Sequence, residues 1–310
     1  MPIQSTIPIL GAPNYLDWFS VLDNGSDQEK NHTFQRDILP CLSDYAEGTS
    51  FGTFLQEHQW LREFTAPESS FAETLRELEH CIGGGVPTTT DNGMIRLGDV
   101  VVSKPAGEHS GVVQYDHGKA EQGYFQRTGA LAPPPRLLLS AAQFLATQRA
   151  RSKMDPIVEN IRRIDTTTRG LRKYEYPGLA QDRLYQPEYL HREARRSCQE
   201  CGCDPAKLIQ RVNAVEDDDG PFVVVHRSTI ASGELAIKNG KLRDDLAKRY
   251  DILCFETEAA GVLTNFPCMV IRGISDYSDS HKNGQWHGYA AAAAAAYARA
   301  LFFHMSDVVD

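Results

Sequence analysis

The chain has 310 residues, of which 41% are hydrophobic, so it is long enough for one large domain with a sizeable core. Its formal net charge of -9 argues against a partner such as nucleic acid, whose phosphate backbone requires a basic face. No apolar run reaches the roughly 18 residues of a membrane helix, and the N-terminus lacks the pattern of a signal peptide. Seven scattered cysteines form no disulfide framework. We therefore expect a cytoplasmic protein without a membrane partner.

Residues 1–80 follow a different pattern from the rest of the chain. They contain polar stretches such as "SSFAETLRELEHC", in which Phe71, Leu75 and Leu78 recur at helical spacing after two serines. This pattern predicts a mainly helical segment with no buried parallel strand. A separate domain is expected over residues 81–310.

From residue 81 onward, strand and helix patterns alternate. "CIGGGVP" indicates a glycine-rich turn, "IRLGDVVVSKP" and "GVVQYDHG" indicate strands, and "PPPRLLLSAAQFLATQRA" indicates a helix introduced by prolines. Residues 151–220 are polar and are interpreted as an irregular or partly helical surface insertion. Further strands are expected in "FVVVHRSTIAS", "DILCF" and "PCMVIRGISD", and further helices in "GKLRDDLAKRY", "ETEAAG" and "GYAAAAAAAYARALFFHMS". This alternation predicts an α/β sheet covered by helices.

Polar groups cluster where predicted strands begin or end. In open α/β sheets, ligands bind beyond the carboxyl ends of the strands, so we expect these groups to converge. Each group also has a purely structural interpretation, because glycines form tight turns, glutamates favour helix starts and aspartates cap turns. The residues are Gly83, Gly84 and Gly85, then Glu256, Thr257 and Glu258, and finally Ser275 and Asp276.

Several motifs together resemble one enzyme superfamily. "GGGVP", "IRLGDVVVSKP", "ASGELAIKNG", "FETEAAG" and "NFPCMVIRGISDYSDSHKN" look like the purine nucleoside phosphorylase and nucleosidase superfamily. The match is closest to the fungal branch that is often fused to ankyrin, tetratricopeptide or nucleotide-triphosphatase modules, and it covers about residues 82–303. The resemblance implies a three-layer α/β sandwich with a mixed central sheet, self-association and no cofactor. It also implies cleavage of the N-glycosidic bond of a purine nucleoside or nucleotide.

The chemistry of that reaction explains which residues the superfamily uses. Breaking the bond leaves negative charge on the base and positive charge on the sugar, so an acid is needed at the base and acceptors at the sugar hydroxyls. The resemblance implies that Asp276 protonates the purine at N7 and that Glu258 accepts hydrogen bonds from the ribose. Glu256 keeps the structural interpretation of a carboxylate at a helix start.

Other residues are assigned to supporting roles. Arg272 lies four residues before Asp276, and ideal alternation places both on one face with Ile274, although a structural role for Arg272 is at least as well favoured. Ser275 is a candidate for orienting the acid. The resemblance implies a turn beside the base with an apolar wall, formed by Ser232, Gly233 and Ile237.

The sequence also departs from the superfamily. Thr257 stands where a methionine usually packs against the sugar, and the superfamily's opening strands are not recognisable before Cys81. This fits an inaccurate gene model joined to a genuine domain, an inactive relative, or a helical segment that covers the sheet edge differently, with the first two favoured together. Because Gly83–Gly85 offer no serine or arginine to phosphate, we favour hydrolysis over phosphorolysis. The alternative is an inactive nucleotide-sensing or interaction module of the same fold.

The stretch "CQECGC" contains a spacing that can bind zinc. Cys198 and Cys201 form a CxxC pair, with Cys203 beyond them and His191 upstream. No second CxxC follows, so a reduced, inert cluster is the favoured interpretation. These cysteines remain weak metal candidates.

Overall fold

A computed structural model describes residues 7–10, 81–193, 196–211, 223–264, 268–282 and 284–309. The helical segment predicted over residues 1–80 lies almost entirely outside this part of the chain. Its described portion is strand β1 (Ile7–Leu10), which the sequence did not predict. β1 pairs antiparallel with residues 268–271 and so covers part of a sheet edge.

The centre of the structure is a mixed seven-stranded sheet that closes on itself. Strands β5, β9 and β10 run parallel to one another, and β2 and β11 run in the opposite direction. The order is β1-β11-β2-β10-β9-β5, β6 pairs with β9, and an additional β11–β5 pairing completes the ring. The strands are β2 (Ile82–Gly85), β5 (Val100–Ser103), β6 (Val112–Gln114), β9 (Val225–Ser232), β10 (Ile252–Glu256) and β11 (Cys268–Asp276).

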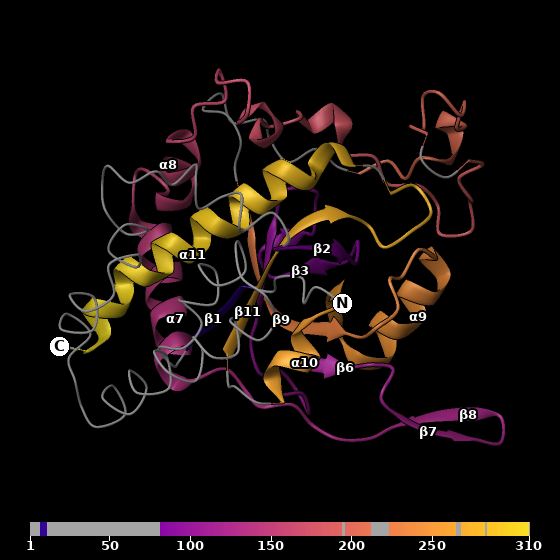
Figure 1. The fold of residues 1–310 in the computed structure, drawn as a ribbon, viewed down its shortest axis with the longest axis horizontal. Coiled ribbons are helices and arrows are strands. Elements are labelled where there is room, and N and C mark those ends of the chain that lie inside the picture. The colour runs from indigo at the N-terminus through magenta and orange to yellow at the C-terminus, as the bar shows by residue number, and fades with distance from the viewer. Residues whose placement is uncertain are drawn as a thin grey trace, which may run out of the picture.

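Helices pack on two sides of this sheet. Figure 1 shows α11 crossing the molecule beside α7 and α8, while α9 and α10 lie on the other side. The α/β class with a mixed sheet and flanking helices is therefore confirmed. The helices are α7 (Arg136–Arg151), α8 (Pro156–Arg162), α9 (Gly240–Tyr250), α10 (Ala259–Leu263) and α11 (His287–Val309).

The predicted insertion over residues 151–220 is irregular where it is described. Beyond α8 it contains short 3-10 turns at Arg172–Tyr174, Leu179–Gln181 and Pro205–Lys207. A further 3-10 turn, Gly284–Trp286, leads into α11. Two small ribbons lie outside the main sheet: β3 (Thr89–Thr90) with β4 (Gly93–Met94), and β7 (Gly118–Glu121) with β8 (Tyr124–Arg127).

Alternating side chains divide the core into an inside and an outside. Val100 and Val102 of β5 pack outward against α7 and α11, whereas Val101 joins the cluster that fills the closed sheet. That inner cluster includes Ile230, Cys254, Val270 and Ile274, which come from β9, β10 and β11. The described part of the chain contains no helix both long and apolar enough to cross a membrane.

The turn predicted at "CIGGGVP" is wrong, because these residues form the buried strand β2. Both edges of β2 are paired, with β10 on one side and β11 on the other. The glycines are needed because neighbouring strands approach closely. A Cβ on Gly85 would lie 2.7 Å from Cγ2 of Ile274, and one on Gly83 would lie 2.9 Å from the carbonyl oxygen of Phe255.

The close packing of β11 against α11 at Gly273 generates a stability prediction. A Cβ at Gly273 would overlap the carbonyl oxygen of Ala290 in α11, so Gly273→Ala must push the helix off the strand. We expect a loss of about 1–3 kcal/mol or more in the free energy of unfolding, measured by urea denaturation. Gly261→Ala is the matched control, because a Cβ there meets nothing within 4 Å. Equal stability of the two variants would contradict the packing described.

Candidate functional site

A buried ion-pair network joins the end of β10 to the middle of β11. Nη2 of Arg272 binds Oε2 of Glu256 and lies 2.9 Å from Oε2 of Glu258. Arg272 is fully buried, as is the Glu256 side chain, whereas the Glu258 side chain is 24% exposed. Since Arg272 lies opposite Val101 in the strand register, its side chain starts from the inner face of the closed sheet.

Glu256 also holds the start of helix α10. Its carboxylate accepts hydrogen bonds from the backbone N–H groups of Glu258 and Ala259, both at 3.0 Å. This agrees with the helix-start interpretation of Glu256, and the ion pair with Arg272 adds a role that the sequence did not indicate. Ser232 supports the same helix start, because its hydroxyl accepts from the N–H of Ala260 at 2.8 Å.

Glu258 is the more accessible carboxylate of the network. Burial raises its pKa, Arg272 acts to lower it, and the neighbouring charge of Glu256 raises it again. The exposed Thr257 donates its hydroxyl to Oε1 of Glu258. Two neighbours therefore fix this carboxylate while part of it still faces solvent.

A second group of side chains surrounds Asp276. Ser275 donates its hydroxyl to Oδ2 at 3.0 Å, and the backbone N–H of Ser278 donates to Oδ1 at 3.0 Å. Nζ of Lys282 lies 3.0 Å from Oδ2. The Asp276 side chain is only 4% exposed, so its carboxylate is held in one orientation and largely shielded from water.

Arg272 and Ile274 share the inner face as predicted, but Asp276 does not join them, because β11 contains a register shift. Ile274 pairs with Gly83 and Asp276 with Gly84, so two steps on β11 match one step on β2. A Cβ on Gly83 would lie 3.4 Å from Cβ of Arg272, whereas one on Gly84 would lie 2.9 Å from Oδ1 of Asp276. Successive strand residues face opposite sides, so Asp276 lies on the outer face and Arg272 on the inner face.

Residues of β10 and β11 meet for a different reason from the one predicted. Because β10 runs antiparallel to β2 and β11, the carboxyl ends of β10 and β11 point in opposite directions. The register nevertheless brings their residues together, since Phe255 and Asp276 both pair with Gly84 from opposite sides. The acid therefore lies one strand away from β10, on the face of Phe255.

Apolar side chains form a wall beside this outer face. Phe255 packs with Tyr115 and the largely buried Ile237, and the two rings meet edge to face at 5.8 Å. Gly233 lies directly against them, because a Cβ there would lie 2.5 Å from the Tyr115 ring. The position of Gly233 and Ile237 fits the turn and apolar wall expected beside a base. Their contact with a ligand stays a prediction.

The residue after the acid is anchored by polar contacts that sequence reasoning missed. The hydroxyl of Tyr277 donates to Oδ1 of Asp182 at 2.6 Å and accepts from Arg211 at 2.6 Å. Its carbonyl oxygen accepts from Arg243 at 2.8 Å. The available signal in the sequence was the run "SDYSDSHKN", which places a tyrosine, three serines and a lysine close to Asp276.

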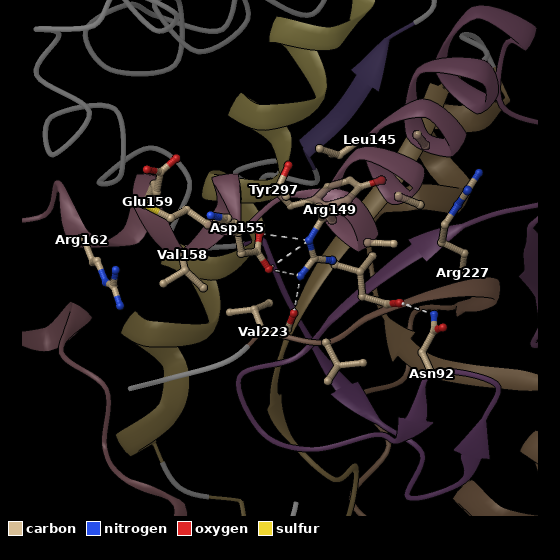
Figure 2. A pocket seen from close by; sticks show the side chains of 18 residues that line it. Asn92, Leu145, Arg149, Asp155, Val158, Glu159, Arg162, Val223, Arg227 and Tyr297 are labelled. Carbon is tan, nitrogen blue, oxygen red and sulfur yellow. Dashed lines mark hydrogen bonds and ion pairs between the residues drawn. The ribbon is translucent and has the colours of Figure 1, made fainter. Parts of the chain in front are cut away.

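Two hollows among the described residues lie away from Glu258 and Asp276. One of about 660 Å³ lies between α7, α8 and the approach to β9, where Arg149 pairs with Asp155 (Figure 2). The other, of about 620 Å³, is bordered by Asp182, Arg211 and part of the insertion. We therefore identify the candidate site by the chemistry of its carboxylates and not by the size of a hollow.

The predicted cysteine cluster is divided in two. Cys198 and Cys203 are buried beside His191 and His281, whereas Cys201 is half-buried with its Sγ 3.9 Å from the carbonyl oxygen of Glu193. The sequence analysis missed His281, which lies 78 residues after Cys203 along the chain.

The chain is similar in sequence to two kinds of curated protein. It is 38% identical over 221 residues to a nucleotide-binding leucine-rich repeat (NLR)-like protein of Hyaloscypha variabilis, covering 71% of this chain and 21% of the relative. It is 38% identical over 94 residues to the ATP nucleosidase Cap17 of Escherichia coli, covering 28% of this chain and 19% of that protein. The chain thus spans about a fifth of the length of these relatives. No family model matches it. The sequence matches support a nucleosidase-like domain, as the motifs indicated.

Solved nucleosidase structures superpose only weakly. A 5'-methylthioadenosine/S-adenosylhomocysteine nucleosidase of Francisella philomiragia gives a TM-score of 0.37 at 15% identity, covering 74% of this chain and 67% of that chain. Futalosine hydrolase of Helicobacter pylori gives 0.38 at 14% identity, covering 74% and 66%. At these TM-scores the superpositions carry no argument about the site.

The two glutamates of the ion-pair network should differ in their effect on stability. Glu256→Gln removes the buried partner of Arg272, so we expect a loss of about 3–5 kcal/mol in the free energy of unfolding. Glu258→Gln should cost less, because its side chain is 24% exposed and Glu256 still pairs with Arg272. Urea unfolding of both variants measures the difference, and a larger loss for Glu258→Gln would contradict the network.

The pH dependence of unfolding provides a second readout for this pair. The pKa of Glu258 is raised above its ordinary 4.5 in the folded chain, so its contribution to stability is present at low pH and is lost as pH rises from 4.5 through the folded pKa. Glu258→Gln should remove that part of the pH dependence. A profile unchanged by Glu258→Gln would rule out the raised pKa.

Proposed function

We propose that this chain hydrolyses the N-glycosidic bond of a purine nucleoside or nucleotide, with Asp276 as the acid. The observation that carries the proposal is the setting of Asp276: a carboxylate held by Ser275 and Ser278 on the same sheet face as the apolar wall of Phe255. A purine needs an apolar surface for its ring and a proton donor at its edge. The match to a protein named ATP nucleosidase supports the same reaction class.

In this proposal, Asp276 supplies a proton to N7 of the purine. The bond between the sugar carbon and the base nitrogen breaks, and its electron pair passes to the base, where the added proton neutralises the charge. Water then bonds to the sugar carbon and releases a proton to solvent, and the Asp276 carboxylate takes up a proton from solvent before the next turnover. Ser275 and the N–H of Ser278 orient the carboxylate throughout. Lys282 must leave Oδ2 when the base arrives.

Glu258 is proposed to accept hydrogen bonds from the ribose hydroxyls. Arg272 holds one of its oxygens at 2.9 Å, and the 24% exposure of the side chain leaves room for a hydroxyl donor. Thr257 takes the place of the usual methionine, so it offers less apolar contact to the sugar. Glu256 serves the site indirectly, by fixing Arg272 and the start of α10.

Hydrolysis is favoured over phosphorolysis by the position of the glycines. Gly83, Gly84 and Gly85 lie in a strand paired on both edges, so their backbone groups serve the sheet rather than form a cradle for an anion. We propose that Gly84 serves the site by giving Ser278 and Asp276 room to approach β2, and direct contact of Gly83, Gly84 and Gly85 with substrate stays a prediction. The group that activates water is expected before Cys81, outside the described residues.

The finer features of the function are proposals as well. We propose a cytoplasmic, self-associating protein that acts on purines, with ATP and adenosine as the first substrates to test because of the named relative. Direct involvement of phosphate is the less favoured form of the reaction. No nucleic-acid partner is proposed, in line with the formal charge of -9.

The alternative is a module that binds a nucleotide without cleaving it. One observation favours it: both Asp276 oxygens are already engaged, Oδ2 by Ser275 and Lys282 and Oδ1 by Ser278. If the ion pair with Lys282 persists when ligand binds, Asp276 cannot deliver a proton. Release of free base distinguishes the two functions.

Replacement of the acid tests the proposal. Asp276→Asn keeps the size of the side chain but removes its acid, so we expect release of adenine from adenosine or ATP to fall by about 10²–10⁴-fold. Chromatographic measurement of free base gives the rate. Asp245→Asn is the matched control, because that carboxylate is exposed on α9 and takes no part in the contacts described around Asp276. Base release by Asp276→Asn at the wild-type rate would remove the acid assignment.

The nucleophile can be identified by withholding phosphate. If water attacks the sugar, base release should proceed at the same rate in phosphate-free buffer and in phosphate buffer, with free ribose or its phosphate derivative as the product. Product analysis for ribose 1-phosphate provides the check. Strict dependence on phosphate would defeat the hydrolytic proposal while leaving the acid role of Asp276 intact.

A further inference from the structure

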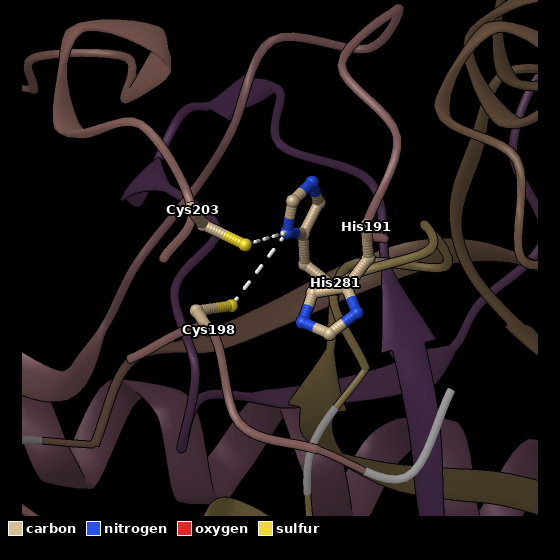
Figure 3. Close-up of side chains that lie close together, drawn as sticks. All are labelled: His191, Cys198, Cys203 and His281. Atoms are coloured by element: carbon tan, nitrogen blue, oxygen red, sulfur yellow. Dashed lines mark hydrogen bonds between the residues drawn. The ribbon is translucent and has the colours of Figure 1, made fainter. Parts of the chain in front are cut away.

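Four metal-binding side chains meet between the insertion and the loop that follows β11. One ligand atom from each of His191, Cys198, Cys203 and His281 lies within 4.8 Å of the others. Figure 3 shows the two cysteines directed at the ring of His281, with His191 beside it. Cys198, Cys203 and His281 are each 8% exposed, and His191 is half-buried. This set includes no carboxylate, so it differs from an ordinary solvated acidic cluster.

The orientation of His281 is the one that metal binding requires. Its Nδ1 lies 3.6 Å from Sγ of Cys198 and 4.0 Å from Sγ of Cys203, while Nε2 lies 3.0 Å from the carbonyl oxygen of Tyr189. Because a carbonyl only accepts, Nε2 carries the proton and Nδ1 presents its lone pair to both sulfurs. Ligating histidines commonly donate their second N–H in this way to a backbone carbonyl.

The spacing fits a tetrahedral ion. Bonds of about 2.0–2.3 Å from zinc to nitrogen and sulfur place neighbouring ligand atoms about 3.3–3.8 Å apart. The two separations from Nδ1 of His281, 3.6 and 4.0 Å, are close to this range, and all four ligand atoms lie within 4.8 Å of one another, so an ion would draw them inward by about 1 Å at most. Without metal, one thiol can donate to Nδ1 of His281, and Cys198 can also bond with Cys203 and Tyr185, but none of these contacts accounts for the His191 ring beside them.

Surrounding contacts hold the four side chains in place. The N–H of Cys203 donates to the carbonyl of Cys198 at 2.9 Å, and the N–H of His191 donates to Oγ of Ser280 at 2.9 Å. Tyr185 stacks on His281 with ring centroids 4.0 Å apart and planes at 17°. The two chain segments are therefore joined at this point by backbone and ring contacts as well as by the four ligands.

We propose that His191, Cys198, Cys203 and His281 bind one structural zinc ion. Two thiolates and two imidazoles complete a tetrahedral shell and leave no open position for a reacting water, which is typical of a structural site. Cys201 is not a ligand, because its sulfur faces the carbonyl of Glu193. This proposed ligand set differs from the sequence interpretation, in which Cys201 was a candidate and His281 was not.

The position of this site indicates what the ion would stabilise. His281 lies between Ser278, which binds Asp276, and Lys282, which pairs with Asp276. An ion there fixes the loop of the candidate acid to the insertion through His191 and the two cysteines. The zinc proposal nevertheless stands on its own geometry and does not depend on nucleosidase activity.

Metal analysis of the full chain tests the proposal. After purification without chelators, we expect about one zinc ion per chain, as in other structural zinc sites. Cys203→Ser and Cys198→Ser should each abolish stoichiometric zinc, whereas Cys201→Ser, the matched control two or three residues away, should retain it. Substitution of cobalt(II) for zinc should give the intense visible absorption of a tetrahedral thiolate site in the wild type and in Cys201→Ser.

Other outcomes overturn the proposal. Wild-type protein that takes up no stoichiometric metal, even when zinc is supplied in excess, would exclude the site. So would an equal loss of zinc in Cys201→Ser and Cys203→Ser. If the cysteine variants fail to fold, the wild type decides the question. A strong chelator should lower its melting temperature, and added zinc should restore it. A melting temperature unaffected by both treatments contradicts a structural zinc.

Discussion

The arrangement of the candidate site depends on one buried ion pair, between Arg272 and Glu256. Both side chains are withdrawn from water at the inner face of the closed sheet, where neither charge is tolerable without the other. Arg272 comes from β11 and Glu256 from β10, so the pair joins two strands that are separated by β2. It also fixes the start of α10 and orients Glu258. A charge pair of this kind adds little net stability, but it restricts how these strands can be aligned.

The glycines of β2 make that alignment possible. Because Gly83 has no side chain, Arg272 can pass over β2 toward β10, and because Gly84 has none, Ser278 and Asp276 can approach the strand from the other face. The register shift in β11 then separates the two functions. Arg272 stays inside with the structural ion pair, whereas Asp276 turns outward to the apolar wall. A regular strand would place the acid inside the sheet, where no substrate could reach it.

The sequence predicted the strands and helices after residue 81 well, because "VVV", "ILCF" and "CMVIRGI" are dense apolar runs that have few alternatives. The prediction of a turn at "CIGGGVP" was wrong. Consecutive glycines usually indicate a turn, and the sequence alone does not show that neighbouring strands approach β2 too closely for side chains. The prediction of a common face for Arg272 and Asp276 was wrong for a related reason. Local alternation contains no information about a register shift, which is set by pairing with β2. His281 was missed because its partners lie about 80 residues away along the chain.

The loop after β11 connects these features to the insertion. Tyr277 is held by Asp182 and Arg211, and His191 is held by Ser280, so the loop is tied to the insertion on both sides of Ser278. Asp276 is therefore positioned partly by residues that no catalytic motif includes. A polar insertion that looks dispensable in the sequence thus contributes to the setting of the acid, because it supplies partners for Tyr277 and Ser280, which follow β11. Changes in the insertion should alter the candidate site without touching any residue of the sheet.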